Sequence, residues 1–257
     1  MRIAYCLHGC IGGLTGKNGE KTYGADTVLK IAKEQMFKTI DTSNIDFFIH
    51  SWDTELESEI NSLYNPKKII VEHQIVFPIP DHLPNNTRVQ SHYSRWYSAK
   101  QSLTLKNLYE NENNFKYDLV ILTRFDLYWL RAYDFSKLNV NNINIEQCLH
   151  KGNVFGYQGA KEIGDRLICS NSDNMNVFLD LYDKIDEYTT PGQCWQWNHI
   201  SSHFMLPWHL HKYNLRNTIQ FPYWFWDLND MSVNKIESSN ITLVRSIYEL
   251  KKVNHEL

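Results

Sequence analysis

The chain has 257 residues and a formal net charge of −3 at pH 7, with 42% hydrophobic and 21% charged residues. These values are typical of a globular protein that is large enough to bury a core. The basic residues are scattered and the apolar runs are short, which argues against a nucleic-acid-binding stripe, a polybasic membrane anchor and a membrane-spanning helix.

The cysteines and the N-terminal segment bear on the cellular compartment. Five cysteines occur far apart and without a CxxC pair: Cys6, Cys10, Cys148, Cys169 and Cys194. This spacing predicts neither a disulfide framework nor a zinc knuckle. The opening residues, MRIAYCLHGC, contain a short apolar stretch interrupted by His8, which favours a strand over a secretory signal. We therefore expect a reducing, cytoplasmic location.

Strand-like and helix-like segments alternate along the first half of the chain. Strands are predicted at 2–7, within 45–53, within 67–77 and along 117–129, and helices at 26–38 and 91–112. Pro78, Pro80 and Pro84 predict an irregular loop before the second helix. This order is typical of an α/β fold with a mostly parallel, Rossmann-like central sheet flanked by helices.

The second half is less regular. We expect a strand near 153–159, a helix at 173–188, an aromatic and His-rich stretch at 194–215 and a C-terminal amphipathic helix at 242–253. No internal repeat or low-complexity linker divides the chain. We therefore expect a single domain over 1–257, with a sheet-based half at about 1–135 and an irregular cap at about 136–257.

Three of the predicted strands end in residues that can do chemistry. The first ends in CLHGC, the second in HSWD, and the strand after the long helix in RFD. Ligands of parallel α/β sheets bind outside the carboxyl ends of the strands. The three ends are therefore expected to converge on one edge of the sheet and to form a candidate site there.

The glycine-rich loop after the first strand, GGLTGKNGE, has a Gly-Lys pair at 16–17. It is not a P-loop, because Ile11 and Asn18 stand where that motif requires Gly and Ser or Thr. Backbone N–H groups of such a loop can still face a phosphate. His8 and Gly9 are therefore candidate phosphate contacts, and the alternative is a loop with no ligand.

Two further patterns suggest chemistry less strongly. His199 and His203 are four residues apart and could share a helix face as zinc ligands, but the segment HISSH lacks the Glu of a zincin and is rich in aromatic residues, which favours packed histidines. A thiol nucleophile at Cys6 or Cys10, activated by His8, would need a third residue to orient the base, and the pattern supplies none.

Arg124 and Asp126 form the strongest candidate pair. Residues two apart at the end of a strand point to the same side. An aspartate there can bind a hard divalent cation, and an arginine can clamp a phosphate with its planar fork. The alternative is a mutual ion pair that closes the strand, and the spacing alone leaves both open.

Four segments, taken in order, resemble the bacterial and viral glycosyltransferases of GT-A-type fold that build capsules and lipopolysaccharide. They are RIAYCLHG at 2–9, DFFIHSWD at 46–53, the predicted helix at 91–110, and YDLVILTRFDLYW at 117–129. A weaker likeness runs through 159–182. The resemblance implies a GT-A-like fold in which about 1–135 bind a nucleotide sugar and about 136–257 lie on the acceptor side.

In that family the fourth segment ends in Asp-x-Asp, whose carboxylates hold Mn²⁺ or Mg²⁺ on the donor diphosphate. This chain has Arg124 at the first position and Asp126 at the second. The resemblance therefore implies that Asp126 holds the metal alone, or that Arg124 supplies the positive charge instead. The donor-binding residues that it implies are His8, Gly9, His50, Asp53, Arg95, Lys100 and Arg124.

The implied reaction is displacement at the anomeric carbon of the nucleotide sugar by an acceptor hydroxyl, with negative charge growing on the leaving diphosphate. Asp165 is the candidate catalytic base, in a segment expected beyond the sheet, and Asp173 is the second choice; the alternative for Asp165 is a helix cap or a turn. The resemblance implies that Asp126 is catalytic through the metal. Trp96 and Trp195 are either stacking platforms or core residues.

The resemblance implies a transferase that acts on a glycan or lipid-linked glycan acceptor in the synthesis of surface polysaccharide. Such an enzyme is expected in the cytoplasm, where it can associate peripherally with the membrane surface. The alternative is a non-catalytic relative that binds a nucleotide or a carbohydrate, in which Arg124 marks the loss of metal chemistry.

Overall fold

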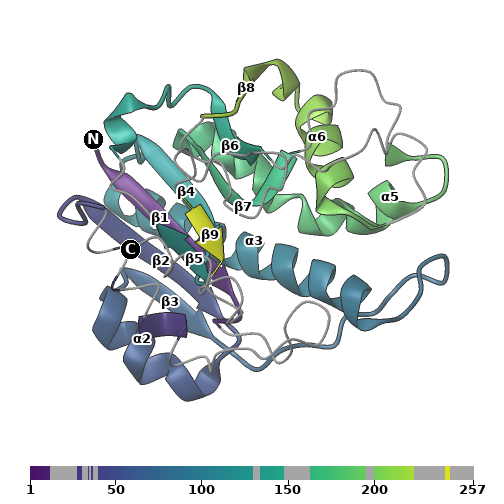
Figure 1. The fold of residues 1–257 in the computed structure, drawn as a ribbon, viewed down its shortest axis with the longest axis horizontal. Helices are drawn as coiled ribbons and strands as arrows, with labels where there is room; N and C mark the ends of the chain where they lie inside the picture. The colour runs from purple at the N-terminus through teal and green to yellow at the C-terminus, as the bar shows by residue number, and fades with distance from the viewer. Residues whose placement is uncertain are drawn as a thin grey trace, which may run out of the picture.

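A computed structural model describes residues 1–11, 28–30, 34, 36, 40–129, 134–147, 163–194, 200–222 and 241–243. Within these ranges the chain forms a seven-stranded sheet of order β3-β2-β1-β4-β7-β6-β8 (Figure 1). Its strands are β1 Ile3–Gly9, β2 Ile45–Ser51, β3 Lys68–Val71, β4 Leu119–Arg124, β6 Ile143–Gln147, β7 Ile163–Ser170 and β8 Ile219–Gln220.

The sheet is mixed but mostly parallel. Strands β3, β2, β1 and β4 are parallel to one another, β7 is antiparallel to both β4 and β6, and β8 is parallel to β6. Strand β7 therefore runs against the other six. The predicted α/β class with a mostly parallel sheet is confirmed at this level, and the second half of the chain contributes three strands to the same sheet as the first.

Apolar side chains cover both faces of the central strands. In β1, Ala4 and Cys6 belong to one buried cluster, whereas Ile3, Tyr5 and Leu7 belong to a second cluster on the opposite face. A strand that is buried on both sides needs a continuous apolar run, and this explains why the central strands stand out in the sequence.

Helices pack on both faces of the sheet. Helix α3, Thr87–Asn113, lies on the face that carries the first cluster and contacts β1, β2 and β3. The side chain of Asn86 caps its first turn by accepting a hydrogen bond from the Val89 N–H at 3.1 Å. The opposite face is covered by helix α2, Glu57–Tyr64, which follows the short 3-10 helix η2, Thr54–Leu56. The sequence predicted α3 but neither α2 nor η2.

The predicted helix at 173–188 is broken into four short pieces. They are α4 Ser172–Met175, η4 Asn176–Leu179, η5 Tyr182–Lys184 and α5 Ile185–Thr189. Met175, Phe178 and Leu181 are fully buried, and they recur every third residue. Because three residues make one turn of a 3-10 helix, this spacing fits the tighter conformation better than a continuous α-helix.

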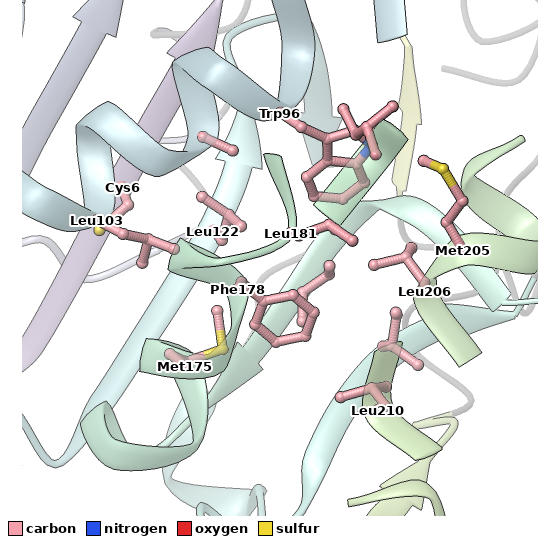
Figure 2. Packing of buried hydrophobic residues seen from close by; sticks show 14 of the residues in the cluster. Cys6, Trp96, Leu103, Leu122, Met175, Phe178, Leu181, Met205, Leu206 and Leu210 are labelled. Atoms are coloured by element: carbon pink, nitrogen blue, oxygen red, sulfur yellow. The ribbon is translucent and has the colours of Figure 1, made fainter. Parts of the chain in front are cut away.

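These residues complete the core on the α3 side of the sheet together with helix α6, Ser202–Lys212. Figure 2 shows Trp96 of α3 in the same packing as Phe178, Leu181 and Leu206. Trp96 is 1% exposed. It is therefore a core residue, which decides between the two interpretations of the sequence.

The C-terminal segment differs from the prediction where it is described. Residues Ile241–Leu243 form strand β9, which pairs in antiparallel fashion with β5, Leu127–Trp129. The predicted helix at 242–253 therefore does not begin at Thr242, because backbone pairing with a distant segment overrides the local helical pattern. The structure also contains two short 3-10 turns, η3 Phe135–Lys137 and η7 Arg216–Thr218.

The predicted strand at 153–159 and the remainder of 244–253 lie outside the described residues. Residues 28–30, 34 and 36 are helical, in agreement with the prediction for 26–38, and Val28, Leu29 and Met36 are buried in the second cluster.

Candidate site at the carboxyl edge of the sheet

The ends of three strands meet in one row, as the sequence predicted. His8 of β1 is the register partner of His50 in β2 and of Arg124 in β4. Strand β7 brings Asp165 to the same edge, because it is antiparallel to β4 with Thr123 opposite Leu167, so that its beginning lies beside the end of β4. Four residues predicted to bind the donor or to act in catalysis are thus gathered by the sheet itself.

Asp165 lies within β7. This corrects the expectation that it lies beyond the sheet, and it also excludes the alternative of a helix cap or turn. Charged residues inside the segment IGDRLICS hid the strand from sequence inspection. The sheet accommodates them because partners on other elements neutralise both charges.

Arg124 and Asp126 form a bidentate ion pair. Arg124 Nε donates to Asp126 Oδ1 at 2.8 Å, and Nη2 donates to Oδ2 at 2.6 Å. Phe125 between them is buried in the cluster on the other face, so the two charged side chains emerge on one side. Asp126 is 3% exposed. The mutual ion pair, one of the two alternatives, is what the structure contains.

A second ion pair joins α3 to β7, where Arg95 Nη1 donates to Asp165 Oδ2. Burial opposes ionisation of the Asp165 carboxyl, but the charge of Arg95, followed by those of His203 and Arg124, outweighs burial and holds its pKa well below the usual range. Asp165 is therefore ionised at neutral pH.

A third pair, Arg166 with Glu146, was not predicted. Glu146 Oε1 accepts from the side-chain Nε of Arg166 at 2.8 Å and from its backbone N–H at 3.0 Å. Register in the β6–β7 ladder shifts between Ile145 and Gln147, so the Glu146 carboxylate takes the place of a ladder carbonyl. Arg166 directly follows the predicted Asp165 in the sequence, and this adjacency was the only signal for it. Glu146 has no such signal, since its segment carries no recognisable motif.

His8 lies next to Arg124 in the sheet and is close enough to Arg95 and Asp165 to be affected by their charges. It is 2% exposed, and its Nδ1 has no hydrogen-bond partner among the described residues. Burial lowers the pKa of His8 well below its ordinary value of 6.5, and the nearby charges of Arg95 and Arg124 lower it further. The imidazole is therefore neutral at neutral pH and can carry its proton on Nδ1.

His50 supports the turn at the end of β1 from inside the protein. Gly9 has a φ of +98°, which suits glycine, and its N–H donates to Ser98 Oγ of α3 at 2.7 Å. His50 Nδ1 hydrogen-bonds the same hydroxyl at 2.6 Å, and its Nε2 lies 3.0 Å from Glu72 Oε1. Ser98 and Glu72 are thus two site residues that sequence inspection missed, because neither belongs to a recognisable motif.

Asp53 holds the next part of the same loop. Its Oδ2 accepts from the Ile11 N–H at 2.7 Å and from Ser51 Oγ at 3.2 Å. Burial raises the pKa of the Asp53 carboxyl above its usual range. His50 and Asp53 therefore position the loop in this structure, and any contact that they make with a donor remains a prediction.

Several other predicted residues are not joined to this cluster. Lys100 Nζ pairs with Asp183 Oδ2 at 2.5 Å. Asp173, the second choice of base, is 84% exposed in its side chain and lies 3.8 Å from Lys116 Nζ, outside the cluster. Trp195 lies outside the described residues.

The structure supports neither the zinc pattern at His203 nor the thiol pattern at Cys6. His203 Nδ1 contacts the Ile163 carbonyl oxygen at 2.6 Å, as a packed histidine does, whereas His199 lies outside the described residues. Cys6 is fully buried, and burial raises the pKa of its thiol to about 12. A thiol that stays protonated in the core is unsuited to the role of nucleophile.

The Mn²⁺ or Mg²⁺ predicted at Asp126 stays a prediction, and the described residues do not fit it. Both Asp126 oxygens are bound by a guanidinium whose charge repels a cation. Within the described ranges, no three His, Cys, Asp or Glu side chains are arranged to hold a metal ion. Hard divalent cations prefer several oxygen ligands, and here the neighbouring carboxylate of Asp165 is already paired with Arg95.

Comparison of the chain with protein-family models and with curated proteins gives no match. In the part of the chain that the structure describes, no helix is long and apolar enough to cross a membrane.

Proposed function

We propose that this chain is a glycosyltransferase that moves a sugar from a nucleotide-sugar donor to a hydroxyl of a glycan or lipid-linked glycan acceptor. The observation that carries the proposal is the row of strand ends at the carboxyl edge of the sheet. There, His8 and Arg124 lie in register, and β7 brings Asp165 beside them. These residues belong to the segments that resemble GT-A-type enzymes in the same order.

The chemistry of sugar transfer suits the charges at this edge. As the bond to the anomeric carbon breaks, negative charge grows on the leaving diphosphate, and cationic groups fixed nearby lower the barrier. Arg95 and Arg124 are the proposed cations, since both lie in the cluster and act electrostatically on the same carboxylates.

Asp165 is proposed as the base that takes the proton of the acceptor hydroxyl. Its pairing with Arg95 keeps it ionised at neutral pH, as a base must be, although the same pairing lowers its basicity. Asp126 is proposed to act through Arg124, by holding the guanidinium in place with both oxygens.

One observation favours a second candidate function, that of a non-catalytic nucleotide- or carbohydrate-binding protein. Each of the two carboxylates proposed for chemistry, Asp126 and Asp165, is bound by an arginine. A relative that had lost transfer would be expected to neutralise its catalytic carboxylates in this way. The two candidates differ in transfer activity, whereas both bind a nucleotide or a sugar.

The first experiment measures the melting temperature with UDP, GDP and CMP, each with Mn²⁺ and with EDTA. One nucleotide should raise the melting temperature, because a ligand that binds the native state stabilises it by mass action. The absence of a shift with every nucleotide, in both conditions, would overturn the proposed function.

A second experiment, on a variant, tests the role of Asp165 as base. Asp165→Asn should keep nucleotide binding but lower the rate of sugar transfer by about 10²–10⁴-fold, because proton transfer is removed without removing the donor contacts. The rate is measured as nucleotide release from the matching sugar donor. Asp173→Asn is the control, and it should transfer at the native rate. Full activity of Asp165→Asn would remove Asp165 from the role of base. Nucleotide binding by the native chain without any sugar transfer would favour the non-catalytic binding protein.

A further inference from the structure

The three ion pairs at the carboxyl edge differ in how much of each guanidinium they use. Arg124 presents its Nε and Nη2 together, and this edge of the guanidinium holds both oxygens of Asp126. Arg166 uses its Nε on Glu146. Arg95 holds Asp165 through Nη1 instead.

The edge of the Arg95 guanidinium formed by Nε and Nη2, its side edge, is therefore unused. Its Nε and Nη2 are both buried and have no hydrogen-bond partner among the described residues. In Arg124 the same two nitrogens bind a carboxylate in bidentate fashion. A buried N–H group without an acceptor costs free energy, because it has lost its hydrogen bonds to water. A ligand with two suitably spaced oxygens would satisfy both donors at once.

His8 adds a third unused donor near Arg95. Its Nδ1 is buried and has no partner among the described residues, and Arg95 is the charged residue with the largest electrostatic effect on it. Ser98, one helical turn after Arg95, holds the Gly9 N–H. The turn that presents His8 and the helix that presents Arg95 are thus joined by a hydrogen bond.

These donors are suited to an anion. A guanidinium side edge matches the oxygen spacing of phosphate, and a neutral imidazole can donate from Nδ1. Arg124 lies next to His8 in the sheet and contributes a further positive charge. A phosphate group held in this way is bound by N–H donors and not through a divalent cation, which agrees with the poor fit of Asp126 to a metal.

We propose that the side edge of Arg95, with Nδ1 of His8, forms a metal-independent subsite for the diphosphate of the donor, while Nη1 of Arg95 remains on Asp165. The inference rests on the proposed function and deepens it. Arg95 would link the leaving group to the carboxylate proposed as base. Arg124 stands at the position of the first aspartate of the family's metal motif, and its positive charge would act where the metal acts in that family.

The test is isothermal titration of the native chain with inorganic pyrophosphate, inorganic phosphate and the nucleotide that shifts the melting temperature, all in EDTA. Pyrophosphate and the nucleotide should bind without Mn²⁺. Pyrophosphate distinguishes a diphosphate subsite from a site for any small anion, which would bind inorganic phosphate equally well and would overturn the proposal. This part needs no variant, so it remains decisive if a substitution prevents folding.

Arg95→Lys then separates the contribution of the bidentate side edge from that of the charge, because lysine keeps the charge but has no bidentate edge. We expect pyrophosphate to bind about 10- to 100-fold more weakly, the loss expected when hydrogen bonds to a charged group are removed. Arg88→Lys is the matched control, because Arg88 lies on the same helix and is exposed; it should bind pyrophosphate as the native chain does.

The outcomes separate the subsite from the proposed function. Nucleotide binding that requires Mn²⁺, or that Arg95→Lys leaves unchanged, would overturn the subsite while the proposed function stands. Pyrophosphate binding that Arg95→Lys weakens, with no binding of any nucleotide, would support the subsite and overturn the proposed function. Binding of both in EDTA, weakened in Arg95→Lys and unchanged in Arg88→Lys, supports both.

Discussion

At the scale of single residues, the site depends on side chains that neutralise charges inside a sheet. Gly164 shows how closely these side chains pack against the sheet. A Cβ at position 164 would lie 1.9 Å from Cγ of Glu146. The Glu146 side chain therefore lies directly over the glycine, and from there it reaches the backbone N–H and the Nε of Arg166. The glycine in this strand is required for close approach of a side chain.

Gly164→Ala should lower the free energy of unfolding by about 1–3 kcal/mol, because the added methyl group overpacks this contact. The measurement is urea denaturation followed by circular dichroism. In a background of Glu146→Ala, where the clash is absent, the same substitution should cost less. Equal costs in the two backgrounds would show that the contact with Glu146 is not the cause.

At the scale of elements, α3 connects the two halves of the site and of the core. It contributes Arg95 to the charge cluster and Ser98 to the turn at Gly9. Two turns further on, its buried Lys106 donates to Glu110 Oε2 at 3.1 Å and to Ser172 Oγ at 2.6 Å. The Lys106–Glu110 ion pair lies within α3, and its hydrogen bonds with Ser172 fix the helix to the start of α4 in addition to apolar packing.

Lys106→Met should destabilise the protein by about 3–5 kcal/mol, because it leaves the buried Glu110 carboxylate without its closest cation. Lys68→Met is the control, since Lys68 forms a partly exposed pair with Glu112, and its loss should cost less than about 1 kcal/mol. Urea midpoints of the two variants provide the comparison. Similar losses would contradict the importance given to burial of the Lys106 pair.

At the scale of the whole molecule, buried histidines and paired carboxylates should make stability depend on pH in one direction. Burial lowers the pKa of His8 well below 6.5 and that of His92 to about 4. Burial opposes a low pKa at Glu110 and Asp165, but the backbone N–H of Tyr117 and the charge of Arg95, respectively, help to hold these carboxyl pKa values below their usual range. In every case the unfolded chain binds a proton more tightly than the native state.

The free energy of unfolding should therefore fall as the pH is lowered, beginning near pH 6.5 as the unfolded histidines take up protons, and continuing below about pH 4.5 as the unfolded carboxylates do. The stability that these groups contribute is fully present above pH 6.5. Urea midpoints at pH 8, 6 and 4 measure the effect. A midpoint that is constant or rises from pH 8 to pH 4 would contradict the assignment of neutral, buried histidines.

The sequence by itself determined the features that local pattern controls. Continuous apolar runs identified β1, β2 and β4, because strands buried on both faces have no polar side. A long stretch without glycine or proline identified α3. From these elements followed the mostly parallel sheet and the convergence of His8, His50 and Arg124 on one edge, since parallel strands end on the same side.

Tertiary structure alone decided which groups meet. Nothing in the local pattern could show that β7 lies between β4 and β6, because the charges of Asp165 and Arg166 are neutralised by Arg95 and Glu146 from distant segments. The same holds for the Arg124–Asp126 pair, whose spacing suited a metal site or an ion pair equally well. Charge pairing depends on distances between segments far apart in the chain, and these distances exist only once the sheet has formed.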